Sequence, residues 1–68
     1  MTFHVLIVKY HNLWTVDSGD WDLAEMGLLE RRTARDFGRD NVRLIDLPDD
    51  SPKSYSLLEK TIGRLNRD

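Results

Sequence analysis

The first apolar run, residues 3–10 (FHVLIVKY), is apolar at both its odd and its even positions. Successive side chains of a strand point to opposite sides, so three apolar side chains face each way. A strand of this kind normally lies inside a sheet and is covered on both sides. His11 and Asn12 follow as a two-residue turn, because Asn tolerates the left-handed backbone that a tight hairpin needs. The pattern therefore predicts a central strand that leads into a hairpin.

Two further strands follow from the same reasoning. Residues 13–17 (LWTVD) are predicted to return antiparallel to the first strand, and residues 41–47 (NVRLIDL) are predicted to form the third. Pro48 ends this third strand, because proline has no N–H to donate within a sheet.

Two helices occupy the remaining segments. The first is expected over residues 23–37 and ends at Gly38, a residue that adopts the left-handed conformation of a helix cap. The second is expected over residues 52–65, with Ser51 as its N-cap and Pro52 in its first helical position. The apolar stripe of this second helix consists of Tyr55, Leu58, Ile62 and Leu65, and Leu57 lies well away from it.

The elements together predict a single small globular domain over residues 1–68, of the α/β (α+β) class. We expect a ββαβα two-layer sandwich with a three-stranded, mainly antiparallel sheet and two helices. If both helices share one face of the sheet, the other face needs a cover. A second copy of the chain or a host protein would supply such a cover, so a homodimer through this second face is one expected arrangement.

Composition narrows the class of protein. The 68 residues contain no cysteine, which excludes disulfides and fits a reducing compartment. The longest apolar run, residues 5–8, is far shorter than the roughly 20 residues that span a membrane, so a soluble cytoplasmic protein without membrane contact is expected. The net charge of −2 is not that of a general nucleic-acid binder, and it is too mild for a DNA mimic. Protein or small-molecule partners are the remaining classes.

Three aspartates, Asp17, Asp20 and Asp22, lie close together before the first helix. With Asp22 as N-cap, Glu25 occupies the third helical position, which is the arrangement of a capping box. The spacing D-x-x-D-x-D does not match a calcium loop of the EF-hand type. We therefore interpret the cluster as the start of a helix and expect neither a metal nor a cofactor.

The chain has two histidines, His4 and His11, and no serine, threonine or cysteine spaced to act as a nucleophile with either. His4 is expected to be a partly covered strand residue. A small metal-dependent or hydrolytic enzyme built on His11, Asp17 and Asp20 is kept as a second alternative, but the sequence predicts a protein that is not an enzyme.

The basic residues of the first helix lie on one face of it. At about 100° per residue, Arg31, Arg32 and Arg35 share one face, with Leu28 among them. Arginines around an exposed leucine are typical of a protein interface or of a surface that meets phosphates, although a charged outer face that only contacts solvent has the same pattern. The candidate partner-binding residues are Leu28, Arg31, Arg32, Arg35 and Arg43, with Trp14 and Trp21 as aromatic anchors.

Glu30 lies near the middle of the apolar stripe of the first helix. A carboxylate there must reach solvent or find a partner. We expect it at the sheet edge, reaching solvent or paired with Lys9 or Arg43.

The order of the elements resembles that of the tiny orphan proteins of bacteriophage genomes, anti-CRISPR proteins among them. The likeness consists of a strand hairpin (HVLIVKYHNLWTVD), a helix (LAEMGLLERRTARDFG), a third strand (NVRLIDLP) and a charged final helix. Many proteins of that kind are accessory factors or inhibitors of host machinery. The resemblance implies stoichiometric binding, and it assigns no functional residue.

The sequence thus predicts a non-enzymatic protein-binding module that masks a surface on another protein, plausibly a complex of the host cell. The alternative partner is nucleic acid, contacted through the same arginines of the first helix and Arg43.

Overall fold

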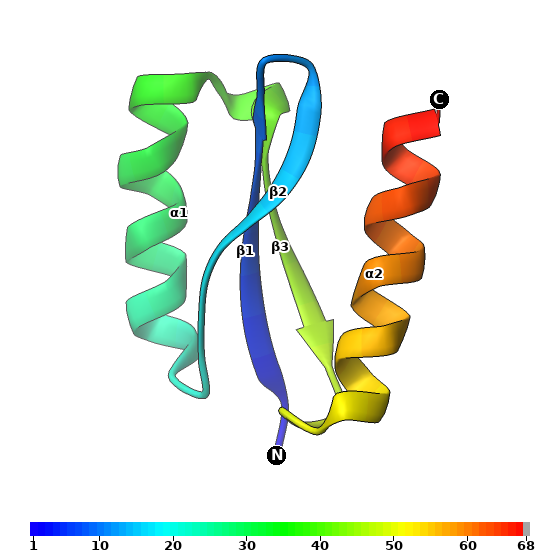
Figure 1. Cartoon of the computed structure of the whole chain (residues 1–68). Coiled ribbons are helices and arrows are strands. Elements are labelled where there is room, and N and C mark those ends of the chain that lie inside the picture. Colours follow the sequence, from blue (N-terminus) through cyan, green and yellow to red (C-terminus); the bar gives the residue numbers. More distant parts are fainter. Residues whose placement is uncertain (68) are drawn as a thin grey trace.

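The computed structural model describes residues 1–67, and these form one compact unit around a central strand (Figure 1). The α+β class and the ββαβα order of elements are confirmed. The elements are β1 (Phe3–Tyr10), β2 (Leu13–Asp20), α1 (Leu23–Phe37), a short 3-10 turn (Arg39–Asn41), β3 (Val42–Leu47) and α2 (Pro52–Arg67).

The sheet has the strand order β2-β1-β3, and β1 pairs antiparallel with both neighbours. The central place predicted for β1 is therefore confirmed. The hairpin between β1 and β2 turns at His11 and Asn12, whose φ angles are 51° and 67°. Positive φ at both positions is the geometry whose twist matches that of the two strands, so the predicted two-residue turn is confirmed as well.

The strand β2 is longer than predicted and continues to Asp20 across a β-bulge. Leu6 pairs with Ser18 and Ile7 pairs with Val16, so Asp17 is the extra residue of the bulge. A bulge bends its strand and increases the local twist. The sequence prediction ended the strand at Asp17 because the polar residues that follow are typical of a turn.

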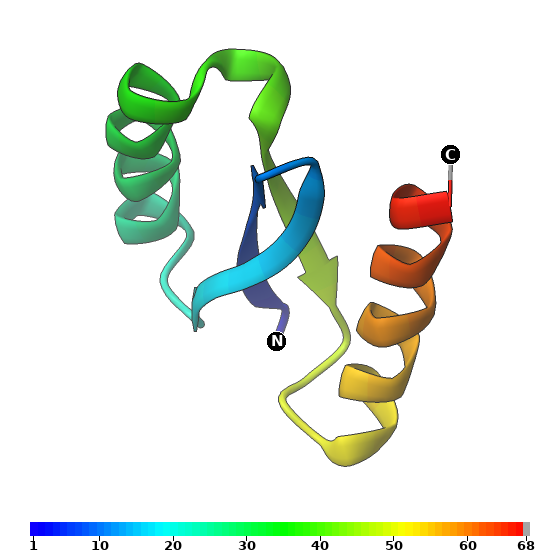
Figure 2. The same cartoon turned by 45° about the horizontal axis from the view of Figure 1, so that its top comes forward.

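Each face of the sheet is covered by its own helix, and the arrangement has three layers (Figures 1 and 2). The expectation of two layers is wrong in this respect, because a strand that is apolar on both faces requires a cover on each. The open sheet face on which the expected homodimer depended is therefore absent. The core on the α1 side contains Leu6, Val8, Met26 and Val42, and the core on the α2 side contains Phe3, Val5, Ile7, Trp14, Leu47 and Leu58.

The C-terminal end of α2 closes one edge of the sheet. The Trp14 backbone N–H donates to Oδ1 of Asn66 at 2.6 Å, and Nδ2 of Asn66 donates to the Trp14 carbonyl at 3.2 Å. The amide of Asn66 thus contacts the outer edge of β2 as a neighbouring strand would, and it protects this edge from pairing with another chain.

The aspartate cluster begins α1, as predicted. The Glu25 backbone N–H donates to Oδ1 of Asp22 at 3.2 Å. The Asp22 N–H donates to Oδ1 of Asp20 at 2.9 Å, so Asp20 takes the role that the capping box assigns to the glutamate side chain. Both carboxylates also lie at the positive end of the helix dipole, where negative charge is stabilising.

The start of α2 is held by a small polar network. The Ser54 N–H donates to the Ser51 hydroxyl at 3.3 Å, which confirms Ser51 as the N-cap. The Ser54 hydroxyl and the Ser51 N–H donate to Oδ1 of Asp49, at 2.6 and 3.0 Å. Hydrogen bonds from the Ser51 hydroxyl, the Ser54 hydroxyl and the Ser51 N–H lower the pKa of Asp49 from 3.8 to about 2.

This network predicts a pH dependence of stability. Because the pKa of Asp49 is lower in the folded state, its charge stabilises the fold above about pH 4, and this contribution is lost as the pH falls to about 2. The Asp49→Asn variant lacks this titration. Chemical denaturation of both proteins at several pH values should show wild type to be more stable at neutral pH and the difference shrinking between about pH 4 and pH 2. A difference that is constant with pH would contradict the assignment.

Three glycines give a second prediction. A Cβ at Gly19 would lie 2.8 Å from Cε2 of Phe3, whereas a Cβ at Gly27 or Gly63 would meet nothing within 4 Å. Gly19→Ala should therefore lower the free energy of unfolding by about 1–3 kcal/mol through overpacking. Gly27→Ala and Gly63→Ala should each raise it by up to about 1 kcal/mol, because alanine is the better helix former. Thermal and denaturant melts test the signs, and a stabilising Gly19→Ala would contradict the close approach of the Phe3 ring.

Candidate binding surfaces on the two helices

The outer face of α1 carries the predicted arginine group. Leu28, Arg31, Arg32 and Arg35 are all exposed, and Leu28 leaves 46% of its surface uncovered. They are spaced three and four residues apart, so they form one stripe along the helix. Among residues 1–67 no arginine or lysine side chain lies within ion-pair distance of a carboxylate, so these three guanidinium groups have no carboxylate partner in that range. The structure thus brings these four predicted residues together.

A groove runs on each side of this stripe. On the β2 side, a groove of about 240 Å³ has Met26 and Leu29 among its lining residues and is bordered by Leu28 and Arg32. On the β3 side, a groove of about 370 Å³ is lined by Ala34 and Val42 and bordered by Arg31, Arg39 and Glu30. In each groove apolar side chains lie beside charged ones, which is the mixed composition of a non-obligate protein interface.

Glu30 lies in the second of these grooves and is half-buried. The sequence prediction placed it at the sheet edge, and the groove between α1 and the start of β3 is at that edge. Within residues 1–67 its carboxylate forms no ion pair with Lys9 or Arg43. The sequence predicted that this carboxylate either contacts solvent or pairs with a basic residue, and the half-buried side chain contacts solvent.

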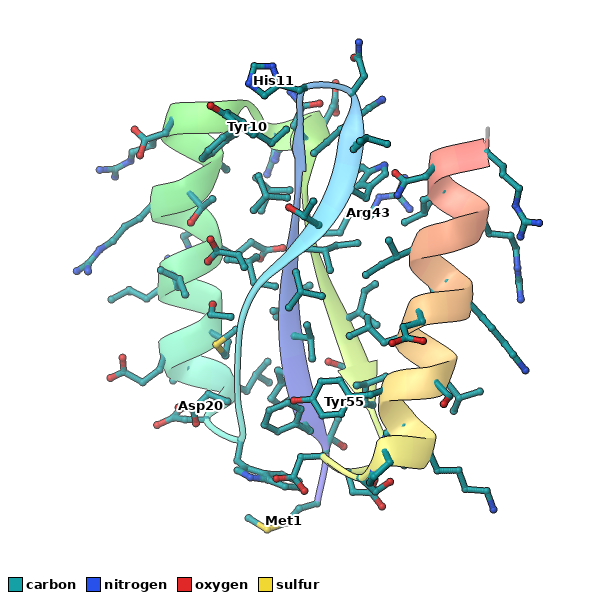
Figure 3. The ribbon with its side chains drawn as sticks, viewed as in Figure 1. Met1, Tyr10, His11, Asp20, Arg43 and Tyr55 are labelled. Carbon is teal, nitrogen blue, oxygen red and sulfur yellow. The ribbon has the colours of Figure 1, made fainter. Side chains whose placement is uncertain are left out.

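Trp14 and Arg43 belong to the opposite side of the sheet. Trp14 is only 6% exposed and is part of the core beneath α2, so it is not an exposed aromatic anchor. The Arg43 guanidinium carbon lies 5.3 Å from the centre of the Trp14 ring, in a cation–π contact. Figure 3 shows Arg43 on the α2 side, away from the arginines of α1. The expectation that Arg43 extends the arginine face of α1 is wrong, since odd positions of β3 point to α2.

Trp21 lies in the turn before α1 and is partly exposed. Its ring meets the Phe3 ring edge-on, with the centroids 5.0 Å apart. This contact covers the end of the α2-side core, because Phe3 is itself a core residue. Trp21 is therefore placed at the beginning of α1, and the arginine stripe occupies the second half of that helix.

The residues of the alternative catalytic site are not brought together. His11 is at the tip of the hairpin and Asp20 is at the opposite end of the sheet, as Figure 3 shows. Asp17 lies between them in the bulge of β2. Residues 1–67 contain no group of three His, Asp or Glu side chains that could hold a metal ion. His4 is more buried than expected, with 6% of its surface exposed, and its Nδ1 lies 2.7 Å from Oδ1 of Asp46.

A second basic stripe lies on the outer face of α2, and the sequence interpretation missed it. At about 100° per residue, Lys53, Lys60, Arg64 and Arg67 fall within about 60° of one another, and Leu57 lies beside them. All five are exposed, and 51% of the Leu57 surface is uncovered. The spacing of seven, four and three residues between these four cations places them on one face of a helix. The sequence alone therefore contained the pattern that predicts this stripe.

No family model, curated protein or solved structure matches the chain. Among residues 1–67, no helix combines the length and the apolar character needed to cross a membrane. Function must therefore be argued from the surfaces themselves.

The reassignment of Trp14 gives a stability prediction. Trp14→Ala should lower the free energy of unfolding by about 3–5 kcal/mol, because it removes a large side chain from a closed core. Arg43→Ala should cost only about 0.5–1 kcal/mol, the value of a partly exposed cation–π contact. Leu28→Ala should change stability by no more than about 0.5 kcal/mol, as an exposed position does. Denaturant melts of the three variants test this order, and a mild Trp14→Ala would show that the ring is not part of the core.

Proposed function

We propose that the chain is a non-enzymatic binding module that masks an acidic surface of another protein, as a small inhibitor or accessory factor of a host complex would. The observation that carries this proposal is the outer face of α1, where Leu28 is exposed among Arg31, Arg32 and Arg35. Arginine is enriched in protein interfaces, and an exposed leucine with arginines around it supplies an apolar contact with a charged border.

The flanking grooves support a protein partner over a solvent-only face. A ridge of side chains between two grooves lets a partner place side chains on both sides of α1, which increases the buried area. Met26 and Leu29 in the β2-side groove supply an apolar contact for an aliphatic or aromatic side chain of the partner. The three unpaired guanidinium groups then meet carboxylates of the partner, which is why its surface is proposed to be acidic.

Binding is proposed in place of turnover because the residues of the alternative site are spread along the sheet, with His11 and Asp20 at its two ends. A general base must reach the proton it removes, either directly or through one water. The absence of cysteine from the sequence agrees with action in a reducing cytoplasm.

The test is affinity capture from the lysate of the native host, followed by mass spectrometry. Arg31→Glu, Arg32→Glu and Arg35→Glu combined should abolish capture of the partner, because like charges across an interface cost several kcal/mol. Leu28→Asp alone should weaken capture by roughly tenfold or more, as loss of a central apolar contact does.

The matched control reverses three basic residues on the other helix, Lys60, Arg64 and Arg67. This variant has the same change of net charge, so the partner that binds α1 should still be captured. Circular dichroism of each variant confirms that it is folded. Capture that survives reversal of the α1 arginines would show that the partner binds elsewhere, and the proposal would then be wrong.

A further inference from the structure

The two helices differ in the charge that they present. The arginines of α1 are balanced within the helix by three acidic residues, Glu25, Glu30 and Asp36. The helix α2 has four basic residues and one acidic residue, Glu59, which lies about 80° or more around the helix from each of the four. Among residues 52–67, no acidic side chain therefore lies within the basic stripe of α2, and Glu59 lies beside it. From Lys53 to Arg67 the stripe extends about 21 Å at the rise of an α-helix.

A hollow lies alongside this stripe. Its volume is about 530 Å³, and Gly63 forms part of it together with Lys60, Arg64 and Arg67 on one side and Ser56 and Glu59 on the other. Glycine inside a helix is unfavourable relative to alanine, and packing does not require it here, since a Cβ at Gly63 would meet nothing within 4 Å. The absence of a side chain lets a ligand approach the helix between three cations.

The net charge of −2 does not describe this surface. Both helices begin at the same end of the sheet (Figure 1), and Asp20, Asp22, Asp49 and Asp50 come just before their first residues in the sequence. Three of the four cations of α2 lie in its second half, toward the other end. Because salt screens charges beyond about 8 Å at physiological ionic strength, a ligand at that end meets the local positive charge.

We infer that the outer face of α2 binds the phosphate backbone of nucleic acid, independently of sequence and independently of the surface of α1. Duplex DNA carries one negative charge per about 1.7 Å of its axis. A stretch of duplex as long as this stripe, about 21 Å, therefore offers about twelve phosphate charges, so each of the four cations has a phosphate within reach. Two of the four cations are lysines, which are depleted in protein interfaces, whereas the three cations of the α1 stripe are all arginines. These features favour phosphates over an acidic protein surface.

Fluorescence anisotropy with a short labelled DNA duplex tests this inference. Four phosphate contacts should weaken binding roughly a hundredfold between about 50 and about 200 mM salt. Lys60→Gln, Arg64→Gln and Arg67→Gln combined should weaken binding by roughly tenfold or more at the lower salt concentration and flatten the salt dependence, because each neutralised contact removes about one unit of the slope. Glutamine is a good helix former, so the variant should remain folded, and circular dichroism checks that it does.

The control neutralises the same number of charges on α1, as Arg31→Gln, Arg32→Gln and Arg35→Gln, and should bind the duplex within about threefold of wild type, since these residues make none of the proposed phosphate contacts. Equal losses for the two variants, or no binding by wild type at the lower salt concentration, would overturn the inference. Unlabelled poly-glutamate is the competitor for the alternative ligand. If it displaces the duplex as effectively as unlabelled duplex does, the surface recognises acidic polymers in general, and the assignment to nucleic acid is wrong. None of these outcomes depends on the partner proposed for α1.

Discussion

The need to cover both faces of β1 determines the rest of the structure. Val5, Leu6 and Ile7 are consecutive and almost fully buried, so water is excluded from the two sides of the strand at once. The neighbouring strands β2 and β3 form hydrogen bonds with the backbone N–H and C=O groups of β1, and one helix covers each face of the sheet. His4 is the one buried polar side chain of this strand, and Asp46 of β3 provides its partner. A chain of 68 residues has little apolar surface to spare, and this arrangement places most of it against a single strand.

The direction of the helices then arranges the charges. The helix α1 crosses from β2 to β3 over one face, and α2 returns over the other face until Asn66 reaches β2. Both helices consequently begin at the same end of the sheet (Figure 1). Their N-termini favour the acidic side chains of Asp22, the N-cap of α1, and of Asp49, which lies beside the Ser51 cap of α2, and their C-terminal halves favour arginine and lysine. A protein of slightly negative net charge therefore has a locally positive outer face on α2, and on α1 it has a row of three arginines whose charge is balanced by acidic residues of the same helix.

Local sequence patterns were sufficient to predict the order of the helices and strands, because the features that start or end them involve residues close in sequence. These features are the turn at His11 and Asn12, the cap at Asp22 and the cap at Ser51. The apolar residues on both sides of β1 indicated that each sheet face needs a cover, but the side of the sheet on which each helix lies is a property of the whole chain, so the pattern did not show that α1 and α2 supply one cover each. The burial of Trp14 was not predicted for the same reason, because it depends on contacts far apart in sequence. Alternation along β2 gives the direction of the Trp14 side chain, but α2 covers that side chain. Asn66, which hydrogen-bonds the Trp14 backbone, is 52 positions away in the sequence. Arg43 was grouped with α1 because its side of β3 depends on a register that periodicity alone does not give.

These constraints also explain why the proposed binding surfaces lie on the helices. Both sheet faces are occupied by the core, and Asn66 closes β2 at Trp14. The outer sides of α1 and α2 are the extended surfaces whose side chains the core does not fix, so a function can be encoded there without loss of stability. They also point away from each other, on opposite sides of the sheet (Figure 2). A module with this geometry can hold a protein on one helix and a phosphate backbone on the other at the same time, because neither ligand occupies the surface that the other needs.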